Sequence, residues 1–261
     1  MELIRLSKSC ISEKEKIAVL EVLENEFLGM GPKVKFFEDQ LSQYFDKRSV
    51  CVSSGTAALH LALQSVGIGR GDSVIVPSIT YVATFQAISA TGATPIPCDV
   101  CEDNFTINIH DAEKKIKDNT KAIIPVHYAG DPGDLELIYN FAKKYELRII
   151  EDAAHAFGSI YKEKKVGSIG DIVCFSFDGI KNITSGEGGC IVSGDENVIQ
   201  HISDARLLSV ENDSSARYKR KRSWNFDVRH QGWRYHMSDI MAAIGSEQLK
   251  RFGELQTKRK I

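Results

Sequence analysis

Short apolar runs alternate with helical patterns from about residue 50 to residue 193. Most of these runs show no regular exchange of apolar and polar positions, which is typical of strands that helices cover on both faces. The predicted strands are residues 50–52, 74–76, 94–97, 122–126, 147–150, 171–177 and 190–192.

The intervals between the runs carry helical spacing. The clearest helix follows Asp134, whose side chain can cap a segment with Leu135, Ile138, Phe141 and Ala142 on one face. Strands that alternate with helices predict an α/β fold, a three-layer α/β/α sandwich on a mostly parallel sheet. Because ligands of such sheets bind beyond the carboxyl ends of the strands, we expect the functional residues at those ends.

The amino-acid composition of the chain bears on its binding partners and on its cellular compartment. The 261 residues are 43% apolar and 26% charged with a formal net charge of −2, which favours neither nucleic acid nor an anionic membrane as a partner. No stretch approaches the roughly 18 apolar residues of a membrane span, and the N-terminus lacks a signal-peptide pattern. Three of the six cysteines, Cys51, Cys174 and Cys190, lie in apolar runs. A reduced, cytoplasmic protein is the resulting expectation.

Three strand ends carry candidate chemistry. After the first strand, Gly55 and Thr56 open a helix whose free amides suit a phosphate, although a simple helix cap explains them equally well. Asp152 ends another apolar strand, and by itself it is most simply a solvated acid. Lys181 stands between an apolar strand and the glycine-rich residues 184–189, where a partly desolvated amine is a candidate for Schiff-base formation.

Taken together, the three strand ends meet the needs of one cofactor. Pyridoxal phosphate requires a lysine for its aldehyde, an acid for its ring nitrogen, a phosphate cradle and a flat group against the ring. The set is more specific than any of its parts.

Several spaced motifs, in order, resemble the DegT/StrS-like sugar aminotransferases among the fold-type I pyridoxal-phosphate enzymes. The resemblance covers nearly the whole chain from about residue 29, and its pattern is nearest to transaminases that make 4-amino-4-deoxy sugars. The motifs are Gly55-Thr56-Ala57-Ala58-Leu59, Pro125-Val126-His127-Tyr128-Ala129-Gly130, Glu151-Asp152-Ala153-Ala154-His155-Ala156, and Phe175-Ser176-Phe177 followed by Lys181-Asn182.

The resemblance implies a role for each matching residue. Lys181 holds the cofactor as a Schiff base and later moves the substrate proton, while Asp152 pairs with the ring nitrogen. His155 lies beside the ring near its phenolic oxygen, and Tyr81 stacks against the ring. The phosphate contacts implied are Gly55, Thr56, Ala57 and Ser176.

A further implied contact crosses a homodimer with shared active sites. In the family a loop reaches the phosphate of the neighbouring subunit's cofactor, and many relatives have Asn followed by Tyr-Arg there. This chain has Arg234 and His236 instead, and which of the two reaches the phosphate stays open.

The implied reaction moves an amino group from an amino acid, usually glutamate, to a nucleotide-linked keto sugar for surface polysaccharide. Lysine rather than histidine at position 181 favours amination over dehydration. Residues 125–130 and 184–189 favour amination at C4 of the sugar, with C3 as the alternative.

The resemblance also predicts the division of the chain. Residues 1–30 form an N-terminal arm and helix, residues 31–245 the pyridoxal-phosphate-binding large domain, and residues 246–261 the start of an interdomain helix. A helical stretch is expected from residues 242–245 to residue 261. The small C-terminal domain of the family is absent, so a catalytically incompetent cofactor-binding fragment, or half of a split enzyme, is the alternative.

Other motifs receive plainer interpretations. Cys98 and Cys101 form a C-x-x-C without a second pair at zinc spacing, so we expect no metal. The basic and aromatic residues 217–224 predict a solvated loop or a contact with the substrate diphosphate rather than a nucleic-acid site. His60 and His127, in apolar surroundings, are expected in the core.

Overall fold

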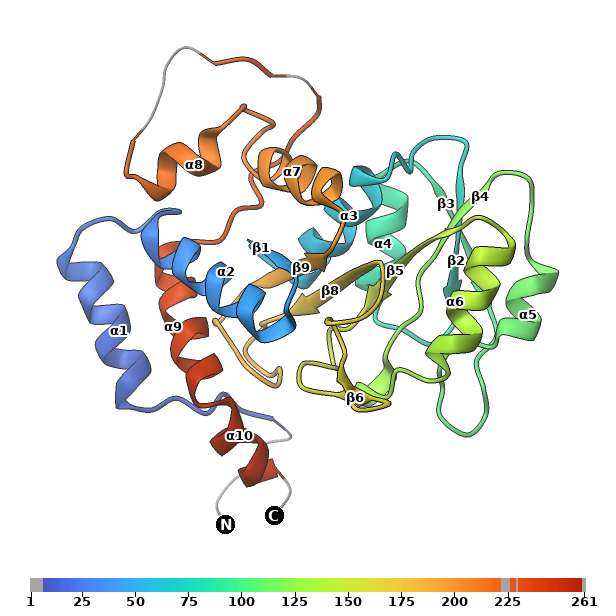
Figure 1. Cartoon of the computed structure of the whole chain (residues 1–261), viewed down its shortest axis with the longest axis horizontal. Coiled ribbons are helices and arrows are strands. Elements are labelled where there is room, and N and C mark those ends of the chain that lie inside the picture. Colours follow the sequence, from blue (N-terminus) through green and yellow to red (C-terminus); the bar gives the residue numbers. More distant parts are fainter. Residues whose placement is uncertain (1–6, 222–225, 229, 260–261) are drawn as a thin grey trace.

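A seven-stranded sheet with helices on both faces forms the centre of the computed structural model, which describes residues 7–221, 226–228 and 230–259 (Figure 1). The strand order is β1-β9-β8-β5-β4-β2-β3. The predicted three-layer α/β/α sandwich is therefore confirmed. None of the helices in these residues is long and apolar enough to cross a membrane.

Each predicted strand has its counterpart in the sheet. All neighbouring pairs are parallel except those of β9, which runs antiparallel to both β1 and β8. The carboxyl ends of the other six strands consequently meet at one edge. The strands are β1 (Arg48–Val52), β2 (Ser73–Pro77), β3 (Thr94–Cys98), β4 (Thr120–Ile123), β5 (Arg148–Asp152), β8 (Ile172–Ser176) and β9 (Gly189–Ser193), with a separate small sheet of β6 (Ile160–Tyr161) and β7 (Lys164–Lys165).

Alternate residues of the strands pack on opposite helical layers. In β8, Ile172 and Cys174 join the cluster of α3, α4 and α7, whereas Val173 and Phe175 face α2 and α9. One layer contains α3 (Gly55–Ser65), α4 (Val82–Ala90) and α7 (Glu196–Ala205), and the other contains α2 (Pro32–Phe45), α5 (Ile109–Lys114), α6 (Leu135–Lys144) and α9 (Asp239–Lys250). The remaining helices are α1 (Glu13–Glu24), which packs on α9, the short η1 (Tyr128–Gly130), α8 (Asp213–Tyr218) and α10 (Phe252–Arg259).

The helix after Asp134 is confirmed as α6. The Asp134 carboxylate accepts a hydrogen bond from the amide of Leu137 at 3.1 Å, so it caps the helix as predicted. All four apolar positions of the predicted face are buried: Leu135, Ile138, Phe141 and Ala142.

The C-terminal helical stretch differs from the prediction. It begins earlier, at Asp239, where the Ser238 hydroxyl caps the amide of Met241, and it is broken at Arg251 into α9 and α10. The Arg251 side chain at the break pairs with the buried Glu15 of α1. Beyond the break, Phe252 joins the apolar cluster under the sheet, so α10 is attached to the large domain.

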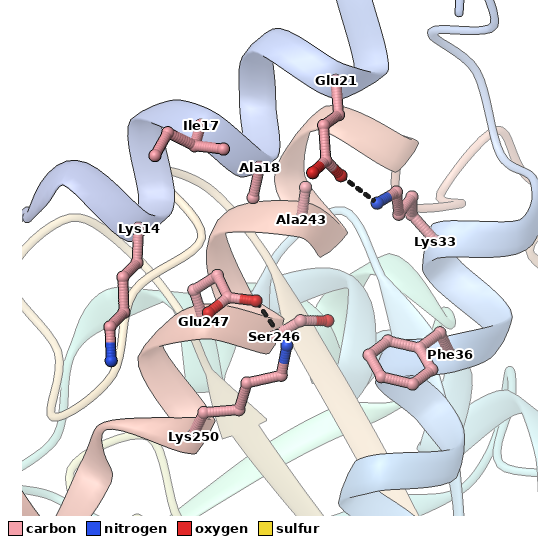
Figure 2. Close-up of a pocket in the computed structure, with 10 residues that line it drawn as sticks. All are labelled: Lys14, Ile17, Ala18, Glu21, Lys33, Phe36, Ala243, Ser246, Glu247 and Lys250. Atoms are coloured by element: carbon pink, nitrogen blue, oxygen red, sulfur yellow. Dashed lines mark hydrogen bonds and ion pairs between the residues drawn. The ribbon is translucent and has the colours of Figure 1, made fainter.

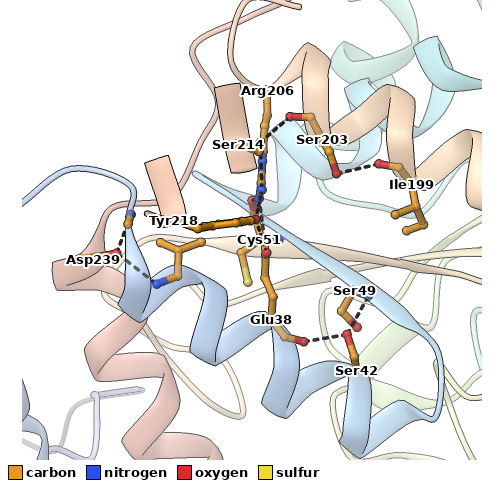
Figure 3. Close-up of polar contacts among 12 residues, drawn as sticks. Glu38, Ser42, Ser49, Cys51, Ile199, Ser203, Arg206, Ser214, Tyr218 and Asp239 are labelled. Atoms are coloured by element: carbon orange, nitrogen blue, oxygen red, sulfur yellow. Dashed lines mark hydrogen bonds and ion pairs between the residues drawn. The ribbon is translucent and has the colours of Figure 1, made fainter. Parts of the chain in front are cut away.

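A fully buried arginine connects α2, β1 and α8 (Figure 3). Arg206 donates to the Glu38 carboxylate and to the Cys51 carbonyl, and the Tyr218 hydroxyl donates to the second Glu38 oxygen. Tyr218 is thus partly buried against the core, and the solvated loop predicted for residues 217–224 is wrong at this position. Residues 222–224 lie outside the described part of the chain.

Candidate active site at the carboxyl edge of the sheet

The site residues expected from the motifs follow neighbouring strands at the same edge. The turn after β1 opens α3, β2 leads to Tyr81, β5 ends in Asp152, and β8 ends at Ser176. In the sheet β8 lies next to β5, with Cys174 paired to Asp152. The fold therefore gathers segments that are far apart in sequence.

The turn before α3 and the end of β8 approach each other closely. The Ser54 hydroxyl caps α3 by accepting from the Ala57 amide at 3.0 Å. A Cβ added at Gly55 would lie 2.9 Å from the Ser176 Cβ, so glycine is what permits this approach. The free amides at the start of α3, beside exposed Thr56 and near the Ser176 side chain, offer hydrogen-bond donors that suit a phosphate.

Close backbone packing at Gly189 accounts for one glycine of the glycine-rich residues 184–189. A Cβ at this position would lie 2.6 Å from the Ser54 carbonyl oxygen and 2.7 Å from that of Phe175. Its φ is not in the left-handed region, so the need for glycine comes from close packing of backbones. The backbone of β9 therefore packs directly against the turn before α3 at Ser54.

Asp152 is buried, with 7% of its surface exposed, and its carboxylate is partly satisfied. Oδ2 accepts from the Thr84 hydroxyl at 2.8 Å, and Oδ1 accepts from the Ala154 amide at 3.2 Å. A carboxylate offers about four lone-pair positions, so capacity for another donor remains. The sequence analysis did not identify Thr84 as a partner of Asp152. The one available indication was its position in α4, one turn after the predicted site residue Tyr81.

The pKa of His155 is affected by two other predicted site residues, Lys181 and Asp152. Partial burial lowers the pKa of its imidazole, the positive charge of Lys181 lowers it further, and the negative charge of Asp152 raises it. His155 is therefore within electrostatic reach of both Lys181 and Asp152. Burial and Lys181 act in the same direction, so both favour the neutral form of the imidazole.

Lys181 is half-buried in the loop between β8 and β9. The Asp178 carboxylate accepts from the amide of Ile180 at 3.1 Å, and the Asp178 carbonyl accepts from the amide of Lys181 at 3.0 Å. At the far side of the loop, the Thr184 hydroxyl donates to the carbonyl of Phe177 at 3.2 Å. These bonds give the loop a defined shape and hold the lysine backbone in place.

The remaining candidates occupy the rim. Tyr81 stands at the start of α4 with 76% of its surface exposed. His236 pairs with Val52 of β1, next to the turn before α3, and burial followed by the charges of Arg234 and two other arginines lowers the pKa of His236 to about 4. Arg234 is exposed, and among the described contacts neither it nor Tyr81 touches Lys181.

These residues fit pyridoxal phosphate. Buried Asp152 keeps acceptor capacity for a ring N–H, the surface between Gly55 and Ser176 would be filled by a Cβ, and Lys181 stands on the loop that follows Ser176. The lysine, the acid and the phosphate surface that the cofactor requires thus follow strands that end at the same edge of the sheet.

A hollow of about 510 Å³ lies elsewhere, between α1, α2 and α9 (Figure 2). Two of its lysines are paired, Lys33 with Glu21 at 3.0 Å and Lys250 with Glu247 at 2.5 Å. It contains none of the predicted site residues. Its lining is Lys14, Ile17, Ala18, Glu21, Lys33, Phe36, Ala243, Ser246, Glu247 and Lys250.

The C-x-x-C motif shows no sign of redox chemistry. Cys98 is buried, and burial raises the pKa of its thiol to about 12, which disfavours the reactive thiolate. All six cysteines are unpaired. In the described ranges no three His, Cys, Asp or Glu side chains are grouped to hold a metal ion.

Comparison with known proteins gives a consistent result. The model of the DegT/DnrJ/EryC1/StrS aminotransferase family matches residues 9–261. An uncharacterised protein of Methanocaldococcus jannaschii is 40% identical over 254 residues, which are 97% of this chain and 66% of that protein. The spore coat polysaccharide biosynthesis protein SpsC of Bacillus subtilis is 40% identical over 253 residues, 95% of this chain and 64% of SpsC.

A solved structure shows the same fold. The putative sugar aminotransferase Spr1654 of Streptococcus pneumoniae in its PMP form has a TM-score of 0.92 and 33% identity, over 99% of this chain and 68% of Spr1654. It is also known in a PLP form. The predicted family and its cofactor, pyridoxal phosphate, are confirmed by these matches. This chain spans 64% to 66% of the length of the two sequence relatives.

Proposed function

The chain belongs to the DegT/DnrJ/EryC1/StrS aminotransferase family, and on this premise we propose that it moves an amino group from an amino acid to a nucleotide-linked keto sugar. The observation that carries the proposal is the grouping of Lys181, Asp152 and His155 at one edge of the sheet. The phosphate-binding turn at Gly55 opens on the same edge. Lysine, acid and phosphate cradle are three of the four protein parts that pyridoxal-phosphate chemistry requires.

Bound pyridoxal phosphate supplies an electron sink for the negative charge that develops on the substrate carbon. Asp152 would hold a proton on the ring nitrogen, because a buried carboxylate favours a nearby positive charge. Thr84 fixes the orientation of that carboxylate by donating to Oδ2. The other Asp152 oxygen, Oδ1, accepts a hydrogen bond from the Ala154 amide, so the carboxylate cannot rotate freely.

Lys181 acts on the substrate carbon. With pyridoxal phosphate bound, the Lys181 amine would hold the aldehyde of the cofactor, and once released it would carry the proton between the substrate carbon and the cofactor carbon. His155 would donate or accept a hydrogen bond at the ring oxygen of the cofactor, and the lowered pKa of its imidazole disfavours a second positive charge there. The Asp178 turn keeps the lysine backbone at the strand end during both steps.

The phosphate lies at the start of α3 in this account. The helix has 11 residues, and its N-terminal amides carry partial positive charge toward the turn. Gly55, Thr56, Ala57 and Ser176 line that turn, and Tyr81 on the rim covers the ring. Arg234 or His236 serves the phosphate of a second subunit in this proposal, so the active form is a homodimer with shared sites.

The substrate assignment rests on relatives. SpsC acts in spore coat polysaccharide biosynthesis, and Spr1654 is a putative sugar aminotransferase. We assign glutamate as donor, C4 of the sugar as the aminated carbon, surface polysaccharide as the destination and the cytoplasm as the location. Residues 31–245 form the cofactor-binding domain in this assignment, with residues 1–30 as arm and helix and residues 246–261 beginning the interdomain helix.

Cofactor binding and turnover are separate parts of the proposal, because the chain spans only 64% to 66% of its relatives' length. A visible absorbance band on addition of pyridoxal phosphate, lost in Lys181→Ala, tests the first. Loss of that band on adding glutamate, with 2-oxoglutarate released in equal amount, tests the second. A lysine-dependent band that ignores glutamate would contradict turnover and leave a cofactor-binding piece; no band would contradict both.

A further inference from the structure

The last residue of α10 reaches the loop that carries Lys181. Arg259 donates from Nη1 to the carbonyl of Asn182 at 2.8 Å and from Nη2 to the carbonyl of Lys181 at 3.3 Å. A planar guanidinium with several donors suits two adjacent carbonyls. The backbone on both sides of the Lys181–Asn182 peptide is therefore held by one side chain.

Asn182 joins this loop to the one that follows β5. Its side-chain amide donates to the carbonyl of Phe157 at 2.9 Å and to that of His155 at 3.3 Å. The loop after β5 begins at Asp152. The Asn182 side chain thus links the loop that carries Lys181 (the Lys181 loop) to the loop that begins at Asp152 (the acid loop).

Helix α10 also packs against the acid loop. The ring centroids of Phe252 and Phe157 are 5.1 Å apart, and a Cβ on Gly158 would overlap the Phe252 ring. One turn along α10, the Gln256 amide donates to the carbonyl of Gly158 at 3.5 Å. The start of the helix is consequently fixed to one loop and its end to the other.

We propose that Arg259 and Asn182 are positioning residues, which hold the Lys181 loop in register with the Asp152 loop through α10. Neither touches the cofactor or the substrate in this proposal; they set the separation between amine and acid. The inference rests on the proposed function in one respect, namely that Lys181 carries the cofactor. If the two residues act in this way, the orientation of α10 sets the separation between the Lys181 amine and the Asp152 carboxylate.

Three variants and one control test the role. Arg259→Gln removes the charged fork, Arg259→Lys keeps the charge but offers a single donor group, and Asn182→Ala cuts the tie to the acid loop. Lys258→Gln is the matched control, because the neighbouring side chain pairs only with Glu254 of the same helix among the described contacts. Arg259 is exposed, so its loss is not expected to unfold the protein.

The first readout is hydrogen exchange of residues 178–184 in the protein without cofactor. Loss of the hydrogen bonds made by either side chain should raise local exchange by about tenfold in Arg259→Gln and Asn182→Ala, with Arg259→Lys in between. The second readout is the pH midpoint of the visible band with pyridoxal phosphate, which should shift in the same variants because the lysine amine moves relative to Asp152. Lys258→Gln should match the wild type in both.

The positioning role and the proposed function fail separately. Exchange and pH midpoint in Arg259→Gln and Asn182→Ala equal to those of Lys258→Gln would overturn the positioning role while a lysine-dependent band still stands. Absence of that band in the wild type would overturn the proposed function, and the exchange experiment would still decide whether α10 holds the loop. Faster exchange together with a shifted midpoint supports the inference.

Discussion

The hydroxyl of Thr84 lies 2.8 Å from Oδ2 of Asp152 and donates to it from the first turn of α4. Thr80 lies 2.8 Å from the same hydroxyl, so a short chain of hydroxyls runs from the rim to the buried acid. The bond orients the carboxylate that is to meet the cofactor ring. It also connects the strand end of β2 with that of β5.

Replacing Thr84 with valine should weaken cofactor binding. The methyl group fills the same space but cannot donate, which leaves Oδ2 of Asp152 short of one partner in a buried site. We expect the dissociation constant for pyridoxal phosphate to rise on the order of tenfold, measured by absorbance titration. Thr84→Ser, which retains the hydroxyl, should bind nearly as wild type, and equal affinities of the two variants would refute the role.

Gly189→Ala should destabilise the fold at the active-site edge. The new Cβ would meet the carbonyl oxygens of Ser54 and Phe175 at 2.6 Å and 2.7 Å, and backbone atoms cannot move aside cheaply. We expect a loss of about 1–3 kcal/mol in the free energy of unfolding, measured by urea denaturation. Gly194→Ala is the control, since a Cβ there meets nothing within 4 Å. Equal stabilities would show that the contact is not tight.

Glu38→Ala should be among the most damaging changes outside the site. It leaves the Arg206 guanidinium buried without its carboxylate, which costs about 3–5 kcal/mol. Asp39→Ala removes an exposed pair with Lys35 on the same helix and should cost less than about 1 kcal/mol. Chemical denaturation of both variants checks the difference, and a similar cost in the two would contradict the burial of the charge pair.

His236 predicts a specific loss of stability in acid. Burial, and then nearby arginine charges, lower its pKa from 6.5 to about 4, so the folded protein binds fewer protons than the unfolded chain between these values. Stability is therefore full above pH 6.5 and falls as the pH drops toward 4. Denaturation across this window should show a shallower slope in His236→Asn, while exposed His110→Asn should keep the wild-type slope. An unchanged slope in His236→Asn would contradict the account.

Much of the fold followed from local pattern. Apolar runs such as residues 171–177 and 190–192 are buried on both faces, so their lack of alternation identified them as central strands. The Asp134 cap and the four apolar positions of α6 were likewise visible in sequence. The antiparallel direction of β9 was not, because direction depends on the length and path of the Lys181 loop rather than on the strand residues.

The site was predicted where a residue type carries its own chemistry. Lys181 follows an apolar strand and Asp152 ends another, and the two became candidates only in combination with the Gly55 turn and the family motifs. Thr84, Asn182 and Arg259 act through partners more than 20 residues away in sequence or through backbone carbonyls, and such contacts leave no local pattern. The break at Arg251 was hidden for the same reason, since its partner Glu15 lies in α1.

The most direct test of the central claim is to map the covalent attachment of the cofactor. The protein is incubated with pyridoxal phosphate, reduced with borohydride, digested and analysed by mass spectrometry. We predict one phosphopyridoxyl group per chain, on the peptide that contains Lys181, and none in Lys181→Ala. A modified lysine elsewhere, or no modification of Lys181 in the wild type, would contradict the assignment of this lysine and of the site built around it.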